Sequence, residues 1–142
     1  MTNKNEKDGP LHGMRVLIVE DEILIALNLE DILSTAGAVV AGLCGSISSA
    51  MGVAENDALS AAVLDVRLGR ETTVELADLL ASRGIPFLFY SGQNLSDDVR
   101  ARFPDAPLLI KPVEPQAFVD AVAKLALRSR PFAAASAQKR RQ

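Results

Sequence analysis

The sequence predicts an α/β domain built on one doubly wound parallel sheet, and three observations support this fold class. Short apolar runs alternate five times with segments of helical period, which is the pattern of β-α-β units. The strand-like runs are apolar almost throughout, as expected when helices cover both faces of a parallel sheet. The 142 residues, 49% hydrophobic and 23% charged, suffice for one domain that folds without a disulfide or structural metal.

The first half of the chain alternates strand and helix up to a third strand. The run RVLIV is rich in β-branched residues, and the apolar period that follows it ends at Gly37, a residue suited to stop a helix. The next helical segment is weaker because Gly52 and several serines dilute it. We expect strands at Arg15–Val19, Ala38–Leu43 and Ala61–Leu64, and helices at Ile23–Ala36 and Ser46–Glu55.

The second half continues the alternation. Gly84 is placed to end one helix, Ser96 to cap the start of the next, and Pro104 to close it. We expect helices at Thr72–Arg83, Ser96–Phe103 and Glu114–Leu127, and strands at Pro86–Tyr90 and Leu108–Ile110. Right-handed crossovers then favour a flavodoxin-like sheet of five strands in the order 2-1-3-4-5, with five helices.

The ends of the chain fall outside this alternation. We expect a flexible N-terminal extension over residues 1–12, a folded domain over 13–128 and a flexible basic tail over 129–142. The segment 128–142 carries five bases and no acid, which leaves 18 acids against 10 bases in the rest of the chain. The modest net charge of −3 therefore hides a distinctly acidic domain, and a globally basic nucleic-acid binder is excluded.

Composition removes several further classes of function. Cys44 is the only cysteine, which excludes a disulfide framework and a cysteine-built zinc site, and we expect it to be a small core residue. His12 is the only histidine and lies in the N-terminal extension, so a catalytic triad is not expected. No apolar run approaches a membrane span and no signal peptide precedes the first strand. We expect a cytoplasmic protein.

Polar residues follow the predicted strands at the edge where ligands bind in a doubly wound sheet. Glu20 and Asp21 follow the first strand, Asp65 the third, Ser91 the fourth and Lys111 the fifth. Clustered carboxylates repel one another, and a hard divalent cation such as Mg²⁺ relieves that repulsion. With Mg²⁺ and the lysine the pocket would be charge-balanced and could accept a phosphoryl group, with Asp65 as the carboxylate nucleophile.

Four motifs at these strand ends resemble those of response-regulator receiver domains, the CheY-like family of bacterial chemotaxis and two-component regulators. The matching segments are VLIVEDE, AAVLDVRLG, FLFYSG and LLIKP, at Val16–Glu22, Ala61–Gly69, Phe87–Gly92 and Leu108–Pro112. The resemblance covers about residues 14–128. It implies a phosphoprotein of a phosphorelay that accepts phosphate on Asp65 from a sensor histidine kinase and catalyses only its own phosphorylation and dephosphorylation.

The resemblance also implies a role for each site residue. Mg²⁺ would be held by Glu20, Asp21, Asp65 and the backbone carbonyl of Arg67. Ser91 would be the switching hydroxyl and Lys111 the phosphate clamp, and the peptide bond before Pro112 would be cis. Arg67 and Gln93 occupy the two positions that tune phosphate loss in the family.

Two departures from the family pattern bear on output. Leu108 stands where receivers commonly carry an inward-swinging Tyr or Phe, so an aromatic switch is not expected. The stretch PFLFYSGQ resembles a subgroup of stand-alone receivers with a Phe-Ala-Thr-Gly pattern, which implies an atypical histidine kinase as partner. Downstream, we expect a protein target or a phosphotransfer protein, and a homodimer is also open. We expect no DNA binding, because the C-terminal tail is too short for a DNA-binding domain.

The sequence leaves one main alternative function and disfavours two others on the same fold. A non-switching receiver-like interaction module is the main alternative, and Leu108 favours it. A flavodoxin is disfavoured because the acidic pair would repel a flavin phosphate, and a dehalogenase-type phosphatase because its nucleophile would follow the first strand. The basic tail is either a solubilising end or an electrostatic handle for an acidic partner or membrane surface.

Overall fold

A parallel sheet of five strands lies at the centre of the computed structural model, which describes residues 9–141, with side chains through residue 128. The sheet consists of β1 (Arg15–Val19), β2 (Val39–Cys44), β3 (Ala61–Leu64), β6 (Phe87–Ser91) and β7 (Leu108–Ile110). Their order is β2-β1-β3-β6-β7, and every neighbouring pair is parallel. The predicted order 2-1-3-4-5 is confirmed, because β6 and β7 are the fourth and fifth strands of this sheet.

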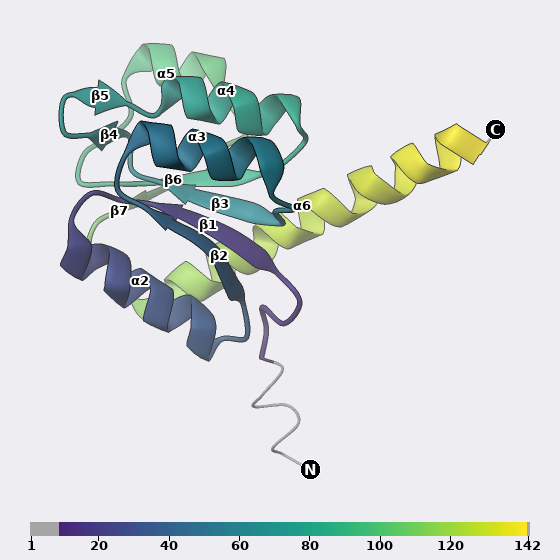
Figure 1. Cartoon of the computed structure of the whole chain (residues 1–142), viewed down its shortest axis with the longest axis horizontal. Helices are drawn as coiled ribbons and strands as arrows, with labels where there is room; N and C mark the ends of the chain where they lie inside the picture. Colours follow the sequence, from purple (N-terminus) through teal and green to yellow (C-terminus); the bar gives the residue numbers. More distant parts are fainter. Residues whose placement is uncertain (1–8, 142) are drawn as a thin grey trace.

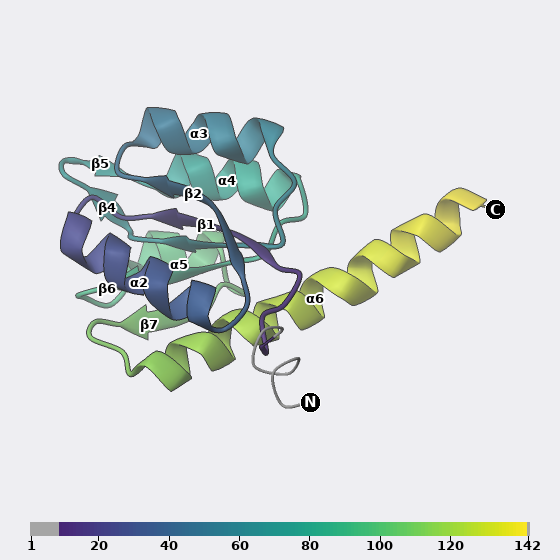
Figure 2. The ribbon, with the colours of Figure 1, turned by 60° about the horizontal axis from the view of Figure 1, so that its bottom comes forward.

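Five helices cover the two faces of the sheet within the part of the chain described. They are α2 (Ile23–Thr35), α3 (Ile47–Asn56), α4 (Val74–Ser82), α5 (Asp97–Arg102) and α6 (Pro115–Arg141). Helices α3, α4 and α5 lie on one face, and α2 and the first part of α6 lie on the other (Figures 1 and 2). This is the doubly wound arrangement that the sequence predicts.

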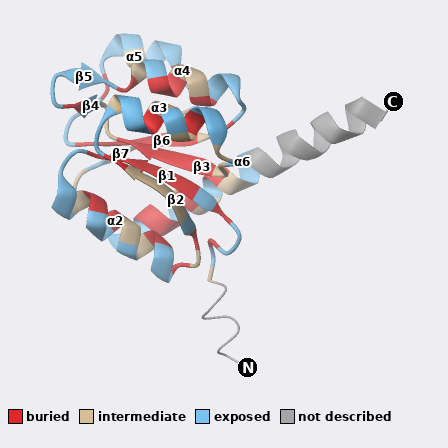
Figure 3. Ribbon diagram, in the orientation of Figure 1, coloured by how far each residue is buried: buried red, intermediate tan, exposed pale blue. Residues whose placement is uncertain are grey.

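The core has two layers, one on each face of the sheet. The inner strands β1, β3 and β6 are almost entirely buried between them, whereas the edge strands β2 and β7 are mostly half-buried (Figure 3). The layer under α2 and α6 is built around Leu29, Leu33, Phe118, Val122 and Leu125. The layer under α3, α4 and α5 is built around Ala50, Ala54, Leu76, Leu80 and Phe103. Cys44 belongs to this second layer, so its predicted place in the core is confirmed.

Three helix ends carry local signals, of which the sequence predicts the cap at Ser96 and the stop at Gly37. Ser46 Oγ accepts a hydrogen bond from the Ser49 amide at 3.2 Å, and Ser96 Oγ accepts one from the Val99 amide at 3.3 Å. Both serines therefore cap their helices. Gly37 has φ 104° just after α2, a conformation that a side chain would disfavour.

One element was not expected. Directly after Asp65, β4 (Arg67–Leu68) and β5 (Glu71–Thr72) pair antiparallel as a short hairpin. Gly69 lies at its tip with φ 60°. Strands of two residues have too little length for a detectable period, and the hairpin moves the start of the following helix from the predicted Thr72 to Val74.

The folded domain begins earlier than expected. Leu11, placed by the sequence analysis in a flexible extension, is fully buried, and its amide donates to the Ala36 carbonyl at 2.9 Å. Gly9, with φ 64°, approaches the same carbonyl so closely that an added Cβ would lie 2.2 Å from its oxygen. A lone leucine between Pro10 and His12 gives no periodic signal, so the sequence could not show this contact.

The last helix is longer than predicted, since α6 extends from Pro115 to Arg141 rather than ending near Leu127. The predicted basic tail, 129–142, lies beyond the described side chains, and its role stays a prediction. Within the described range, no helix is both long and apolar enough to span a membrane.

Candidate metal centre

Three acidic side chains meet at the carboxyl edge of the sheet. Glu20 and Asp21 follow β1 and Asp65 follows β3, and this edge lies where α2 begins, beside the β4–β5 hairpin (Figure 1). Backbone hydrogen bonds hold both positions: the Glu20 amide donates to the Cys44 carbonyl at 2.9 Å and the Asp65 amide to the Val19 carbonyl at 3.0 Å. One oxygen from each of the three carboxylates lies within 4.8 Å of the others.

Lys111 joins this cluster from the end of β7. Its Nζ lies 2.9 Å from Glu20 Oε1 and 3.1 Å from Asp65 Oδ2. The cluster is assembled from strands far apart in the chain, since 91 residues separate Lys111 from Glu20 and 46 separate it from Asp65. The sequence predicts that five polar side chains meet at this edge, and four of them, the three acids and Lys111, lie together in the structure.

Burial and hydrogen bonding shift the pKa values of two of these groups. Burial raises the pKa of Glu20 above its usual range and outweighs the hydrogen bonds that it accepts from Lys111 and from the Glu22 amide. For Lys111, burial acts to lower the pKa, but the hydrogen bonds to Glu20 and Asp65 and the charges of both carboxylates raise it overall. The lysine therefore carries a firmly held positive charge beside a carboxylate that is costly to ionise.

The donor set suits a hard divalent cation. All three acidic side chains offer carboxylate oxygens, which Mg²⁺ prefers, and the open edge leaves room for the waters that Mg²⁺ retains. Asp21 is exposed, whereas Glu20 is only 4% exposed, so the pocket is open on the side of Asp21. Three carboxylates against one lysine leave an excess of negative charge that such a cation would neutralise.

The hairpin after β3 contacts two of the acidic residues. The Gly69 amide donates to Asp21 Oδ2 at 3.0 Å. This bond fixes one carboxylate oxygen and leaves the other oxygen available as a ligand. The Arg67 amide lies 3.5 Å from Asp65 Oδ1, too long for more than a weak hydrogen bond. Gly69 is the last residue of the motif AAVLDVRLG, but nothing in the sequence indicates that its amide reaches an acidic residue 48 positions earlier.

The remaining predicted residues lie around the cluster rather than in it. Ser91 ends β6 and is buried, and its Oγ accepts a hydrogen bond from the Gln93 amide at 3.2 Å. The Lys111 amide pairs with the Ser91 carbonyl at 2.8 Å, so the two residues share one strand pair at the edge. Leu108 is half-buried against the layer of α3, α4 and α5. The Lys111–Pro112 peptide bond is cis, as predicted.

Two residues near the cluster were missed by the sequence analysis. Thr73 is fully buried, and its hydroxyl donates to the Asp65 carbonyl at 2.7 Å and lies 3.2 Å from the Val66 carbonyl. Lys111 Nζ lies 5.4 Å from the centre of the Tyr90 ring, within the range of a cation–π contact. A threonine before an amphipathic run is typical of a helix cap, so its position gave no hint of a bond back to Asp65.

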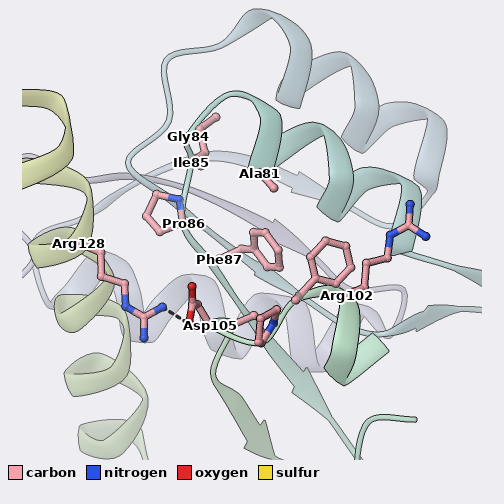
Figure 4. A pocket seen from close by; sticks show the side chains of 11 residues that line it. Ala81, Gly84, Ile85, Pro86, Phe87, Arg102, Asp105 and Arg128 are labelled. Atoms are coloured by element: carbon pink, nitrogen blue, oxygen red, sulfur yellow. Dashed lines mark hydrogen bonds between the residues drawn. The ribbon is translucent and has the colours of Figure 1, made fainter. Parts of the chain in front are cut away.

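A pocket of about 460 Å³ lies at the opposite end of the sheet, near the start of β6 and β7 (Figure 4). Its walls are largely apolar and include Ile85, Phe87 and Phe103. Arg128 on its rim donates through Nη1 to the Asp105 carbonyl at 2.5 Å. None of the site residues that the sequence predicts lines this pocket, so the acidic cluster stands as the candidate functional site.

The chain was compared with protein families, curated proteins and solved structures. No family model and no curated protein matches it. The receiver domain of HemR from Leptospira biflexa is 25% identical, with a TM-score of 0.70 over 80% of this chain and 94% of that one. SdrG from Sphingomonas melonis Fr1 is 41% identical, with a TM-score of 0.68 over 79% of this chain and 95% of that one.

A further similar structure is a response regulator receiver protein from Sinorhizobium medicae, 23% identical, with a TM-score of 0.73. That match covers 84% of this chain and 98% of the other. At this identity the likeness shows the fold alone. The acidic edge, the 25% identical receiver domain of HemR and the 41% identical SdrG show that the chain belongs to the response-regulator receiver (CheY-like) family of two-component signalling.

Proposed function

We propose that the protein is a phosphoacceptor of a two-component phosphorelay, which takes a phosphoryl group from a histidine kinase onto Asp65 with the help of Mg²⁺. The observation that carries this proposal is the placement of Asp65, whose carboxylate is half-buried, 3.1 Å from Lys111 and grouped with Glu20 and Asp21. A nucleophilic carboxylate beside a fixed cation and a metal-type donor set is the arrangement that aspartyl-phosphate chemistry needs.

In the proposed reaction an Asp65 carboxylate oxygen bonds to phosphorus while the bond between phosphorus and the donor histidine nitrogen breaks. The electron pair of the broken bond stays with the imidazole. Lys111, already hydrogen-bonded to Asp65, would then bind a phosphoryl oxygen and hold the product in place. Glu20, Asp21, Asp65 and the Arg67 carbonyl would hold Mg²⁺, which supplies charge neutralisation for the phosphoryl oxygens.

The other predicted residues take part after transfer. Ser91 ends the strand next to β3, and its hydroxyl would turn toward the phosphoryl group and signal its presence. Arg67 and Gln93 are exposed beside the pocket, where they would meet the water that removes phosphate. The protein thus acts on itself alone, and its output passes through a protein target or a phosphotransfer protein rather than through turnover of a substrate.

The surface next to the pocket suits a protein donor. Ile23, Leu24 and Leu27 on the first turns of α2 are 62%, 79% and 46% exposed. They directly follow the acidic pair in the chain, so a donor that covers them would bring its histidine to the edge of the pocket. Exposed leucine and isoleucine side chains at a charged edge are typical of a protein contact.

A labelling experiment tests the acceptor. The purified protein is incubated with an acyl phosphate and Mg²⁺, and intact mass is measured after acid quench. We expect an acid-stable gain of one phosphoryl group in the wild type and in Asp98→Asn, an exposed control on α5, and no gain in Asp65→Asn. A gain that persists in Asp65→Asn, or no gain in the wild type, would sink the proposal.

A non-switching interaction module is the second candidate, and Leu108 is the observation that favours it. An aliphatic side chain, half-buried against the core, cannot reproduce the two positions of an aromatic switch. This candidate expects the same amide chemical shifts in β7 and α5 with and without phosphorylation. If phosphorylation of Asp65 changes those amide chemical shifts, the protein is a switch that works without an aromatic side chain, and this second candidate is wrong.

A further inference from the structure

Thr73 stands at the start of α4 but does not act as a helix cap. It occupies the residue before Val74, where a threonine hydroxyl usually accepts a hydrogen bond from an amide of the first turn. No such bond is present, although the Thr73 carbonyl begins the helix by accepting from the Ala77 amide at 2.9 Å. The hydroxyl is used elsewhere.

That hydroxyl is directed back to the acceptor residue. It donates to the Asp65 carbonyl at 2.7 Å and lies 3.2 Å from the Val66 carbonyl, while the Thr73 amide donates to the same Val66 carbonyl at 2.9 Å. Thr73 is fully buried, so water does not replace these bonds easily. One side chain therefore closes the loop that begins at Asp65 and ends at α4.

The closed loop is the β4–β5 hairpin, and its tip reaches Asp21, the acidic residue that follows β1. Gly69 at the tip donates its amide to Asp21 Oδ2 at 3.0 Å. The base of the hairpin is thus fastened at Asp65 by Thr73, and its tip orients Asp21. A shift at the base would move Asp65, the Arg67 carbonyl and the Gly69 amide together.

We propose that Thr73 is a positioning residue for the phosphoacceptor pocket, which it serves by holding the β4–β5 hairpin so that Asp65, Asp21 and the Arg67 carbonyl form one cation site. The inference rests on the proposed function, because it assigns Thr73 to the same pocket. It goes beyond that function in giving the hairpin a role. Groups that orient metal ligands from behind commonly change metal affinity by about 10- to 100-fold when they are removed.

The test uses the full chain and three variants. Thr73→Val keeps the shape of the side chain and removes the hydroxyl, and Thr73→Ser keeps the hydroxyl. Val122→Ala, on the buried side of α6 and away from the pocket, serves as a destabilised control. Two quantities are measured: Mg²⁺ affinity by calorimetry with MgCl₂, and hydrogen exchange of the Gly69 amide in metal-free protein.

We expect Thr73→Val to weaken Mg²⁺ binding roughly tenfold and to speed Gly69 exchange several-fold, with both restored in Thr73→Ser and unchanged in Val122→Ala. Wild-type values in Thr73→Val, or equal losses in Val122→Ala, would overturn the inference. If the wild type binds no Mg²⁺ but Gly69 exchange responds as expected, the hairpin's positioning role holds and the proposed function fails.

Discussion

Lys111 supplies the positive charge that two partly buried carboxylates share. It lies 2.9 Å from Glu20 and 3.1 Å from Asp65, and the three side chains are 19%, 2% and 14% exposed. Because water reaches these groups poorly, the charge of the lysine offsets carboxylate repulsion that solvent would otherwise screen. The residue therefore matters for folding as well as for the proposed phosphoryl clamp.

We expect Lys111→Met to lower the free energy of unfolding by about 1–3 kcal/mol, since two carboxylates lose their common partner. Millimolar Mg²⁺ should recover more of that stability in the variant than it adds to the wild type, because it replaces the missing charge. Urea unfolding with and without Mg²⁺ measures both effects. Lys124→Met, an exposed change on α6, is the control, and equal stability of the two variants would contradict the expectation.

At the scale of single elements, α2 offers an exposed apolar face beside the pocket. Leu24 is 79% exposed, so Leu24→Asp should change the stability of the free protein by no more than about 0.5 kcal/mol. If a kinase docks on this face, transfer from a phosphohistidine protein should slow markedly while labelling by an acyl phosphate stays the same. Rates from the two donors, compared side by side, separate docking from chemistry.

Leu127→Asp is the matched control for that prediction. Leu127 is 62% exposed on α6, and the substitution makes the same change of a leucine to a carboxylate away from the start of α2. It should leave both rates at the wild-type value. A similar slowing in both variants would point to net charge rather than to a docking face.

The short helix α5 is held differently from the others. It has no fully buried residue of its own. Its Val99 is only partly buried against the core, and the buried residues Leu95 and Phe103 lie on either side of it. Its Arg102 forms an ion pair with Asp78 of α4, and an exposed pair of this kind adds at most about 1 kcal/mol. We expect the α5 amides to exchange with solvent far faster than those of β3, as measured by native-state hydrogen exchange.

That prediction has an internal check in the same experiment. Amides of α4, which buries Leu76, Ala77 and Leu80, should exchange slowly although α4 lies on the same face of the sheet. Equal protection of α4 and α5 would contradict the view that buried side chains, rather than helix length or location, hold each helix. A loosely held α5 is suited to move when the pocket changes.

At the scale of the whole molecule, two core layers share one buried sheet. We expect them to unfold together, because neither layer can keep its half of the sheet when the other is lost. The chain carries a natural probe in each layer: Tyr90, the only tyrosine, under α2 and α6, and Cys44, the only cysteine, under α3 to α5. Tyrosine fluorescence and thiol reactivity should report the same urea midpoint, and separate midpoints would show two units.

The sequence predicted the strand order, the five helices and the convergence of Glu20, Asp21, Asp65 and Lys111. These features follow from apolar periodicity and from the rule that parallel strands end at one edge. It could not predict the hairpin after Asp65, whose two-residue strands have no period, or the backward hydrogen bond of Thr73. Leu11 was missed for a similar reason. A single apolar residue among loop residues forms no periodic pattern, and its contact with Ala36 becomes visible only in the folded structure.

The distance along the chain between the acids and Lys111 also bears on how the protein is made. A ribosome releases Glu20, Asp21 and Asp65 first, and Lys111, which lies 46 residues beyond Asp65, emerges last. Until β7 pairs with β6, the growing chain holds three acidic groups without the cation that offsets them. The counter-charge therefore arrives only with β7, and the acidic cluster is completed after the other four strands of the sheet have been made.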